Sequence, residues 1–281
     1  KYLIIDDQMY LLGGRNTFNL FLGDYTPVKN IDRELFIYET VGDPEASIHQ
    51  LKQYFQSVWE LPDAKLYTKM GDWEKSQECI QWLTAHADAL KSSYPSAYEP
   101  WDYEALTMET NRITLLHNPI NASNKEPWMW ETVCHLMGTG KEITVYTPYI
   151  ICGKEMYADL TALCKKTDLV EIITNDVASG ANPWGCTDYL NQKKKIWATG
   201  VRVYEYLGEH SSHSKAVLID DNFQTIASGD YSGASHLEDG LWSYTTEEIW
   251  GGLQSAYASM ANDVETAYGE KLTHVGHIGF S

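Results

Sequence analysis

The sequence predicts an α/β protein of two related halves, each a mixed β-sheet flanked by helices. Three observations lead to this prediction. Strand-length apolar runs alternate with helical segments in the second half, one hairpin pattern occurs twice, and the chain is long enough to bury a large core. The 281 residues are 43% hydrophobic and 21% charged, which is typical of one large globular domain or two closely packed halves.

The alternation of strands and helices begins near residue 111. Strands are expected at short apolar runs, and helices where apolar residues recur every three or four positions. The expected strands are residues 113–116, 143–146, 170–174 and 201–206, and the expected helices are residues 127–137, 156–165 and 189–198. Such alternation is typical of a largely parallel or mixed sheet that helices cover.

A pattern at the start of the chain recurs 214 residues later. Residues 1–7, Lys-Tyr-Leu-Ile-Ile-Asp-Asp, align without a gap with residues 215–221, Lys-Ala-Val-Leu-Ile-Asp-Asp. In both copies Asp-Asp marks a turn and a second apolar run follows, so each copy is expected to form a β-hairpin. Small residues end the return strand in both copies, Gly-Gly at 13–14 and Ala-Ser at 227–228. The hairpin would place these small residues beside the Lys.

The rest of the first half carries fewer signals. Residues 34–38 predict a strand, and Asp43-Pro44 predicts the start of a helix, with Asp as its N-cap. Five apolar residues on one face of that helix are expected in the core: Ile48, Leu51, Phe55, Val58 and Trp59. The Ser/Pro-rich residues 91–102 are the best linker candidate. We therefore expect a first half at 1–100 and a second at 101–281.

The net charge of -18, from 21 basic and 39 acidic residues, makes nucleic acid an unlikely partner. The one compact basic run, Lys193 to Lys195, is expected on the solvated face of a helix. The chain has no apolar run of about 18 residues and no recognisable signal peptide. Both a cytoplasmic and a membrane-associated location therefore stay open.

The cysteine pattern argues against disulfides and structural zinc. The count is odd, no Cys-x-x-Cys occurs, and all five are expected to be reduced: Cys79, Cys134, Cys152, Cys164 and Cys186. Two His-x-x-His pairs, at 210–213 and 274–277, lack Cys or carboxylate partners at a convincing spacing. A metal ion is therefore not expected.

The clearest chemical pattern is His213-Ser-Lys215-Ala-Val-Leu-Ile-Asp220. Residues i and i+2 of a strand share a face, so His213 and Lys215 are expected to point to one site. An imidazole can attack phosphorus or carry a proton near neutral pH, and a nearby ammonium offsets charge on phosphoryl oxygens. Asp220 ends the strand and is better placed behind the site than against a phosphate.

This pattern resembles the phospholipase D superfamily, whose motif is His-x-Lys-x4-Asp followed after six residues by Gly-Gly/Ser-x-Asn. The second copy matches it with His213, Lys215 and Asp220, and residues 227–230, Ala-Ser-Gly-Asp, stand at the second part. The first copy matches at the same spacing with Lys1, Asp6, Gly13, Gly14 and Asn16. Three further stretches are similar to the cardiolipin synthase-like branch: residues 32–59, 147–149 and 200–206.

The resemblance implies two phospholipase D-like repeats with the site at their interface and no metal or cofactor. The implied catalytic residues are His213, Lys215, Asp220, Lys1 and Asp6, and the implied phosphate-binding residues are Asn16, Ser228, Asp230 and Gly14. One histidine of each repeat takes part. One attacks phosphorus to form a phosphohistidine, and the other protonates the leaving alcohol and then activates water or a second alcohol. His213 is assigned the acid/base role, although the two roles could be reversed.

The first copy lacks the histidine that the family has two positions before Lys1. We therefore expect the chain to be a fragment or a processed product, and a preceding segment to complete the site. Asp230 also departs from the family, which has Asn there. Unless it is protonated or turned away, its carboxylate would repel a phosphate.

The leading hypothesis is a phosphodiester-bond enzyme that acts on phospholipids at a membrane surface. Its reaction would be phosphatidyl transfer, as in cardiolipin synthesis, or phospholipase D hydrolysis. A nuclease of the same superfamily is an alternative, although the sequence shows no basic groove leading to His213. A further alternative, motivated by Asp230, is a catalytically impaired member that binds a phosphorylated ligand.

Overall fold

The computed structural model describes residues 1–22, 26–67, 71, 73–110, 112–120, 126–178, 183–220, 223–227, 239–244 and 272–274. The chain forms two compact units. The larger unit combines Lys1–Tyr54 with Glu109–Ser281, and the smaller unit is Phe55–Met108. Among the helices of the described residues, none has both the length and the apolar character that crossing a membrane requires.

The main sheet of the larger unit has eight strands in the order β13-β8-β7-β6-β10-β11-β12-β5. These strands are β5 (Arg112–His117), β6 (Glu142–Tyr146), β7 (Leu169–Asn175), β8 (Arg202–Tyr206), β10 (Ala216–Ile219), β11 (Phe223–Ala227), β12 (Asp239–Tyr244) and β13 (Leu272–His274). The central strands β6, β7 and β8 are parallel, and the other neighbours pair antiparallel. The predicted mixed α/β fold is confirmed.

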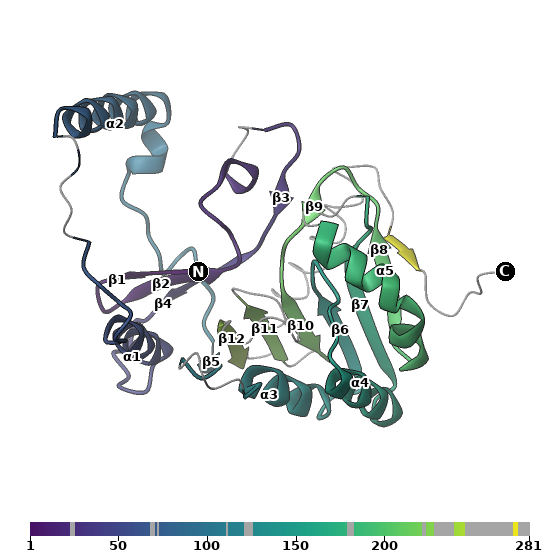
Figure 1. Cartoon of the computed structure of the whole chain (residues 1–281). Coiled ribbons are helices and arrows are strands. Elements are labelled where there is room, and N and C mark those ends of the chain that lie inside the picture. The colour runs from purple at the N-terminus through teal and green to yellow at the C-terminus, as the bar shows by residue number, and fades with distance from the viewer. Residues whose placement is uncertain are drawn as a thin grey trace. The chain divides into compact units, whose positions relative to one another are not determined.

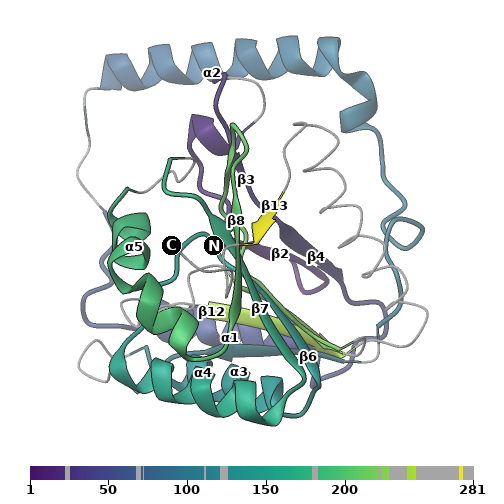
Figure 2. The ribbon, with the colours of Figure 1, turned by 90° about the vertical axis from the view of Figure 1, so that its right-hand side faces the viewer.

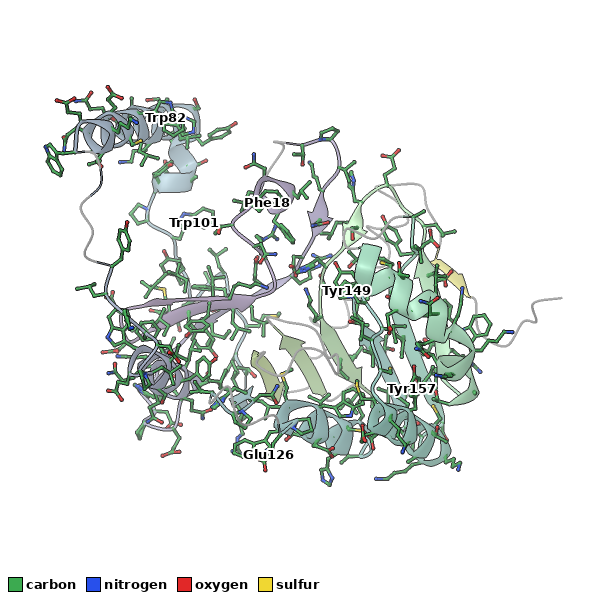
Figure 3. All side chains as sticks on the ribbon, viewed as in Figure 1. Phe18, Trp82, Trp101, Glu126, Tyr149 and Tyr157 are labelled. Atoms are coloured by element: carbon green, nitrogen blue, oxygen red, sulfur yellow. The ribbon has the colours of Figure 1, made fainter. Side chains whose placement is uncertain are left out.

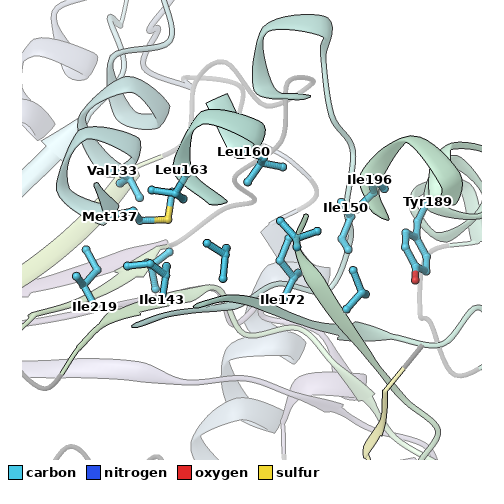
Figure 4. Close-up of a cluster of buried hydrophobic side chains, with 14 residues drawn as sticks. Val133, Met137, Ile143, Ile150, Leu160, Leu163, Ile172, Tyr189, Ile196 and Ile219 are labelled. Carbon is cyan, nitrogen blue, oxygen red and sulfur yellow. The ribbon is translucent and has the colours of Figure 1, made fainter. Parts of the chain in front are cut away.

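Helices cover this sheet and contribute buried side chains to its core. They are α3 (Trp128–Met137), α4 (Lys154–Lys166) and α5 (Pro183–Ala198), and α3 and α4 run along the sheet together (Figures 1 and 2). Buried side chains of the helices, such as Val133 and Leu160, face Ile143 and Ile172 of the strands (Figure 4). The four strands and three helices predicted here are all present, with bounds shifted by a few residues.

A second, three-stranded sheet in the order β1-β2-β4 comes from the first part of the chain. Its strands are β1 (Tyr2–Ile5), β2 (Met9–Gly13) and β4 (Glu34–Tyr38), and α1 (Ser47–Trp59) packs against it. Ile113 and Leu115 of β5 join the same apolar cluster, and the Leu115 N–H donates to Gln50 Oε1 at 3.0 Å. The first sheet is therefore packed to the edge of the main one.

The two predicted hairpins have the same register. In β1–β2, Tyr2 pairs with Leu12, and in β10–β11, Ala216 pairs with Ile226. Each further pair of the second hairpin likewise lies 214 positions after a pair of the first. The similar sequences thus adopt the same local geometry.

The turns of the two hairpins also match. Asp6 has a φ of 51° and Asp220 a φ of 48°, so both adopt the left-handed conformation. Among non-glycine residues, Asp and Asn tolerate this conformation best, because their short polar side chains can bond locally. The Asp of each copy is therefore suited to the turn itself.

Helix α1 begins later than the sequence predicted. Asp43 Oδ1 accepts the Glu45 N–H at 2.9 Å, and the Asp43 carbonyl accepts the Ala46 N–H at 3.0 Å. These bonds form a turn, and the helix starts only at Ser47. Of its predicted core residues, Ile48 and Leu51 are buried, Val58 is half-buried, and Phe55 and Trp59 are exposed. The core prediction was therefore wrong for Phe55 and Trp59.

The smaller unit contains helix α2 (Trp73–Ser93), which the sequence did not predict, and the short 3-10 helix η2 (Pro95–Tyr98). The expected linker, residues 91–102, therefore includes the last turn of α2 and all of η2. Helix α2 buries none of its residues, and Trp82 is exposed on it (Figure 3). Ile80, Leu83, Ala87 and Leu90 recur at helical spacing, so the sequence carried a signal for this helix that the prediction missed.

The basic run on α5 is only partly solvated, which corrects the expectation for Lys193. Its ammonium forms an ion pair with Glu205 Oε1 at 2.5 Å, and the Tyr189 hydroxyl donates to the same oxygen at 2.7 Å. Glu205 is buried in β8, so it requires these partners. Lys194 and Lys195 are exposed, as predicted. All five cysteines are free.

Candidate active site

A two-stranded parallel ladder brings the first part of the chain next to His213. It pairs β3 (Asn30–Ile31) with β9 (Ser211–Ser212), Asn30 opposite Ser211 and Ile31 opposite Ser212. The His213 N–H donates to the Ile31 carbonyl at 2.7 Å. This register places the next residue of the first strand, Asp32, opposite His213.

Asp32 and His213 form a close pair. His213 Nδ1 lies 2.7 Å from Asp32 Oδ2, and only 1% of the Asp32 side chain is exposed. The other carboxylate oxygen, Oδ1, accepts the Arg33 N–H at 2.9 Å. An ionised carboxylate only accepts, so we assign the proton of the pair to Nδ1. That tautomer leaves Nε2 of His213 as the reactive nitrogen.

Lys215 lies against the His213 ring. Its Nζ is 2.8 Å from Nδ1 and 2.9 Å from Nε2, and it donates to the His213 carbonyl at 2.5 Å. Because Nδ1 carries the proton that bonds Asp32, Nε2 is the ring nitrogen that can accept a hydrogen bond from the ammonium. Lys215 is 2% exposed, and a charge removed from water interacts more strongly with a neighbouring anion. The two residues thus lie together as the strand spacing predicts.

Arg15 holds the residues that touch His213. Its Nη2 donates to the Asp32 carbonyl at 3.2 Å, its Nη1 to the Phe21 carbonyl at 2.5 Å, and its Nε to Glu34 Oε1 at 2.7 Å. Phe21 ends the short helix η1 (Asn19–Phe21), and its ring meets the His213 ring edge-on, with centroids 5.0 Å apart. One guanidinium therefore bonds the backbone carbonyls of two residues whose side chains contact the imidazole, Asp32 and Phe21.

Gly14 makes room for the Asp32 carboxylate. A Cβ atom at residue 14 would lie 2.8 Å from Asp32 Oδ2 and 2.9 Å from Oδ1. Real Cβ atoms do not approach other heavy atoms so closely, so a side chain here would push the carboxylate away from His213. The described contacts of Gly14 thus concern Asp32, while its predicted role in phosphate binding stays a prediction.

Tyr146, at the end of β6, lies behind the strand that carries His213. Burial raises the pKa of its hydroxyl, while the neighbouring Ser212 side chain and the positive charge of Arg33 act in the opposite direction. Burial is the larger effect, so the phenol stays protonated. It can therefore serve as a neutral hydrogen-bonding group beside Ser212.

Comparison with known proteins agrees with this arrangement. Residues 133–242 match the family model described as the PLD-like domain of cardiolipin synthase. The matched residues form a phospholipase D-like domain. The matched range contains β6, β7, β8, β10 and β11, together with His213 and Lys215. No curated protein sequence matches the chain.

One solved structure shares the fold over most of this chain, and a second aligns with part of it. Phosphatidylserine synthase from Haemophilus influenzae Rd KW20 aligns with 96% of this chain at a TM-score of 0.58 and 15% identity, and the chain spans 61% of that protein. Nuc, a phospholipase D family member from Salmonella typhimurium, aligns with 59% of this chain and 98% of its own at a TM-score of 0.42 and 13% identity. The first of these likenesses shows a shared fold over nearly the whole chain.

Asp220 of the phospholipase D-like domain lies away from this site. Its Oδ1 accepts the backbone N–H groups of Lys141 at 2.8 Å and Glu142 at 2.7 Å, so it ties the end of β10 to the start of β6. The four residues of β10 lie between Lys215 and Asp220, which places the two residues about 16 Å apart along the strand. Asp6 occupies the equivalent turn of the first hairpin. These positions favour a structural role for both carboxylates, which the sequence had placed among the catalytic residues.

Lys1 and Asn16 lie at the other end of the first hairpin. The Lys1 carbonyl accepts the Gly13 N–H at 3.0 Å, which puts Lys1 at the hairpin end next to Gly14. The Lys1 side chain is exposed, and Asn16 is half-buried. Their catalytic and phosphate-binding roles stay predictions. Ser228 and Asp230 of the second copy lie outside the described residues, as does His236.

Sequence reasoning missed Asp32, Arg15 and Phe21. Asp32 begins one of the stretches that resemble the cardiolipin synthase-like branch, which is the only signal that pointed toward it. Arg15 stands at the variable position of the Gly-Gly-x-Asn pattern, so the pattern does not mark it as a functional residue. Phe21 is an ordinary apolar residue in sequence, and only the fold places it against His213.

Proposed function

We propose that this chain forms part of a phosphodiester-bond enzyme that acts on phospholipids, by phosphatidyl transfer or by hydrolysis. The observation that carries the proposal is the cluster of Asp32, His213 and Lys215. A buried carboxylate orients the imidazole, and a buried ammonium adjoins it. This is the arrangement that acid/base catalysis at a phosphoryl group needs.

In the proposed reaction His213 acts through Nε2. A nucleophilic histidine, supplied by the first repeat in the family pattern, bonds to phosphorus while the bond from phosphorus to the leaving alcohol breaks. His213 gives its Nε2 proton to that alcohol. It then takes a proton from water or an acceptor alcohol, which attacks phosphorus and releases the first histidine. Asp32 stabilises the imidazole while it is doubly protonated, before the first proton transfer and after the second, and Lys215 stabilises charge on the phosphoryl oxygens.

The proposal of a lipid substrate rests on charge and on similarity. The net charge of -18 disfavours a long polyanion such as DNA. The matching family model is that of a cardiolipin synthase domain, and the protein that aligns over most of the chain is a phosphatidylserine synthase. Both names refer to enzymes of phospholipid synthesis, so we place the substrate in this class.

The test is to incubate the full-length protein with phosphatidylglycerol vesicles and to measure cardiolipin and phosphatidic acid. We expect one of these products, and its loss in His213→Ala. His135→Ala is the matched control, because His135 is exposed on α3 outside the site. Turnover of oligonucleotides without turnover of lipid would contradict the lipid substrate. Equal activity of the two variants would contradict the role of His213.

Asp230 favours a second candidate, a member that binds a phosphorylated ligand with impaired turnover. Here Asp230→Asn should raise the rate, since it restores the neutral amide of the family pattern. If the full-length protein with Asp230 is already fully active, this candidate fails.

A further inference from the structure

The backbone that carries His213 is held from two opposite sides. The Ser211 N–H donates to the Lys29 carbonyl at 3.1 Å, and the His213 N–H donates to the Ile31 carbonyl. Both bonds point toward β3. In an extended chain the N–H between them points the other way. That N–H, from Ser212, donates to Asn175 Oδ1 at 2.8 Å.

Asn175 bonds Ser212 twice. While its Oδ1 accepts the Ser212 N–H, its Nδ2 donates to the Ser212 carbonyl at 2.7 Å and to the Pro148 carbonyl at 3.3 Å. A primary amide presents a donor and an acceptor side by side, as a peptide group does, so this side chain replaces a strand partner. Asn175 is the last residue of β7 and is 1% exposed.

These contacts decide where His213 lies relative to Lys215. Lys215 immediately precedes β10, whose Ala216 pairs with Tyr146 of the main sheet. The position of the Lys215 backbone is therefore set by the main sheet. His213, in contrast, bonds Asp32 and β3. The Asn175 amide attaches the strand of His213 directly to the ends of β6 and β7. Without this amide, the segment of His213 would keep its hydrogen bonds to β3 alone, and the imidazole would be free to move away from the Lys215 ammonium.

We propose that Asn175 is a positioning residue for His213, which sets the distance between the imidazole and the ammonium of Lys215 by holding Ser212 against the main sheet. The kinetic part of this inference rests on the proposed function, whereas the structural part does not. Asn175→Asp keeps the size and one acceptor but cannot donate to the two carbonyls when ionised. Asn175→Ala removes all three bonds.

The matched control is Asn118→Ala. Asn118 is 5% exposed, and its Oδ1 accepts the Met129 N–H at 2.9 Å, at the start of α3. Both substitutions remove a buried amide that bonds backbone, so both should lower the melting temperature, and Asn175→Ala should lower it more because it removes three bonds. Only the Asn175 variants should affect His213.

The test follows the ring nitrogens of His213 by NMR in the full chain labelled with ¹⁵N-histidine, over a pH titration. We expect Asn175→Asp and Asn175→Ala to shift the His213 signals and the midpoint of its titration, and Asn118→Ala to leave both unchanged. In the lipid assay the Asn175 variants should lose kcat by about 10²-fold with little change in KM, as misplaced catalytic groups do.

Wild-type His213 signals in both Asn175 variants would overturn the proposal, whatever their stability. If these variants do not fold, amide hydrogen exchange of the wild-type chain tests the bond between Ser212 and Asn175 instead. Slow exchange at Ser212 supports the bond to the buried amide, and fast exchange contradicts it. An absence of lipid turnover in every form would remove the proposed function but leave the NMR result to decide this inference.

Discussion

The two hairpins share a register, a left-handed Asp and a Lys at the same position, but their surroundings differ. Strand β10 lies inside the eight-stranded sheet between β6 and β11, whereas β1 is an edge strand of the three-stranded sheet. Accordingly Lys215 is buried and Lys1 is exposed. The similar sequences encode the same hairpin, and the neighbouring strands decide which of the two lysines is buried.

The two parts of the chain also supply different residues to the site around His213. The second copy supplies the imidazole and Lys215, and the chain following the first hairpin supplies Asp32 through the β3–β9 ladder. Neither part alone contains the Asp32–His213 pair. The site is therefore a product of the contact between them.

The largest expected effect is that of Asp32→Asn. An amide at this position can turn its N–H₂ toward Nδ1 and favour the wrong tautomer, so kcat should fall by about 10³-fold or more. Asp43→Asn is the control, because Asp43 lies in an exposed turn. Lipid turnover rates of the two variants provide the check. Similar rates would mean that the Asp32–His213 bond does not serve catalysis.

Next in size is the contrast between the two lysines. Lys215→Met removes a buried positive charge and should lower kcat by about 10²–10³-fold, the usual effect of losing one charge-stabilising group. Lys1→Met should cost less, because water screens an exposed charge. The comparison uses kcat/KM on the same vesicles. A greater loss of kcat/KM in Lys1→Met than in Lys215→Met would show that burial does not decide which lysine matters more for turnover.

A smaller effect, about 10-fold on kcat, is expected for Arg15→Lys. An ammonium cannot bridge the Asp32 carbonyl, the Phe21 carbonyl and the Glu34 carboxylate at once, so the neighbours of His213 should loosen. Arg112→Lys, on the exposed start of β5, is the control. Unchanged kcat in Arg15→Lys would mean that the guanidinium does not position Asp32 or Phe21.

The smallest effect on turnover is expected at the two hairpin turns. Asp6→Ala forces Ala into the left-handed conformation at a cost of about 1 kcal/mol, and Asp220→Ala also loses two bonds to backbone N–H groups, for about 2–4 kcal/mol in total. Chemical denaturation measures both, and turnover should stay within about twofold of wild type because neither carboxylate adjoins the phosphoryl site. A large loss of turnover in Asp220→Ala without a loss of stability would restore its catalytic role.

Much of the main sheet was predictable, because several of its strands are short apolar runs that alternate with helices along the chain. The hairpins were predictable because each local pattern contains its own turn. Helix α2 was missed although Ile80, Leu83 and Leu90 stand at helical spacing, and it buries none of its residues. The start of α1 was misplaced because Asp43 closes a turn before the helix.

The site was predictable only where it is local. His213 and Lys215 lie two residues apart on one extended segment, so their spacing alone predicts that they meet. The Asp32 contact depends on a ladder of two residues on each side, between segments 181 positions apart in sequence. No pattern of hydrophobicity or propensity indicates so short a pairing. Asn175 was missed for the same reason, because its partner Ser212 belongs to a distant strand.

The central claim is that His213 acts as the acid and base of a phosphodiester reaction on lipids. It is tested most directly with a phosphatidyl ester of p-nitrophenol, a leaving group that departs without protonation. In His213→Ala of the full-length protein we predict a burst of about one p-nitrophenolate per active site, followed by a stall, because the phosphohistidine forms but no base activates water. The absence of a burst, or continued turnover at the wild-type rate, would contradict the acid/base role.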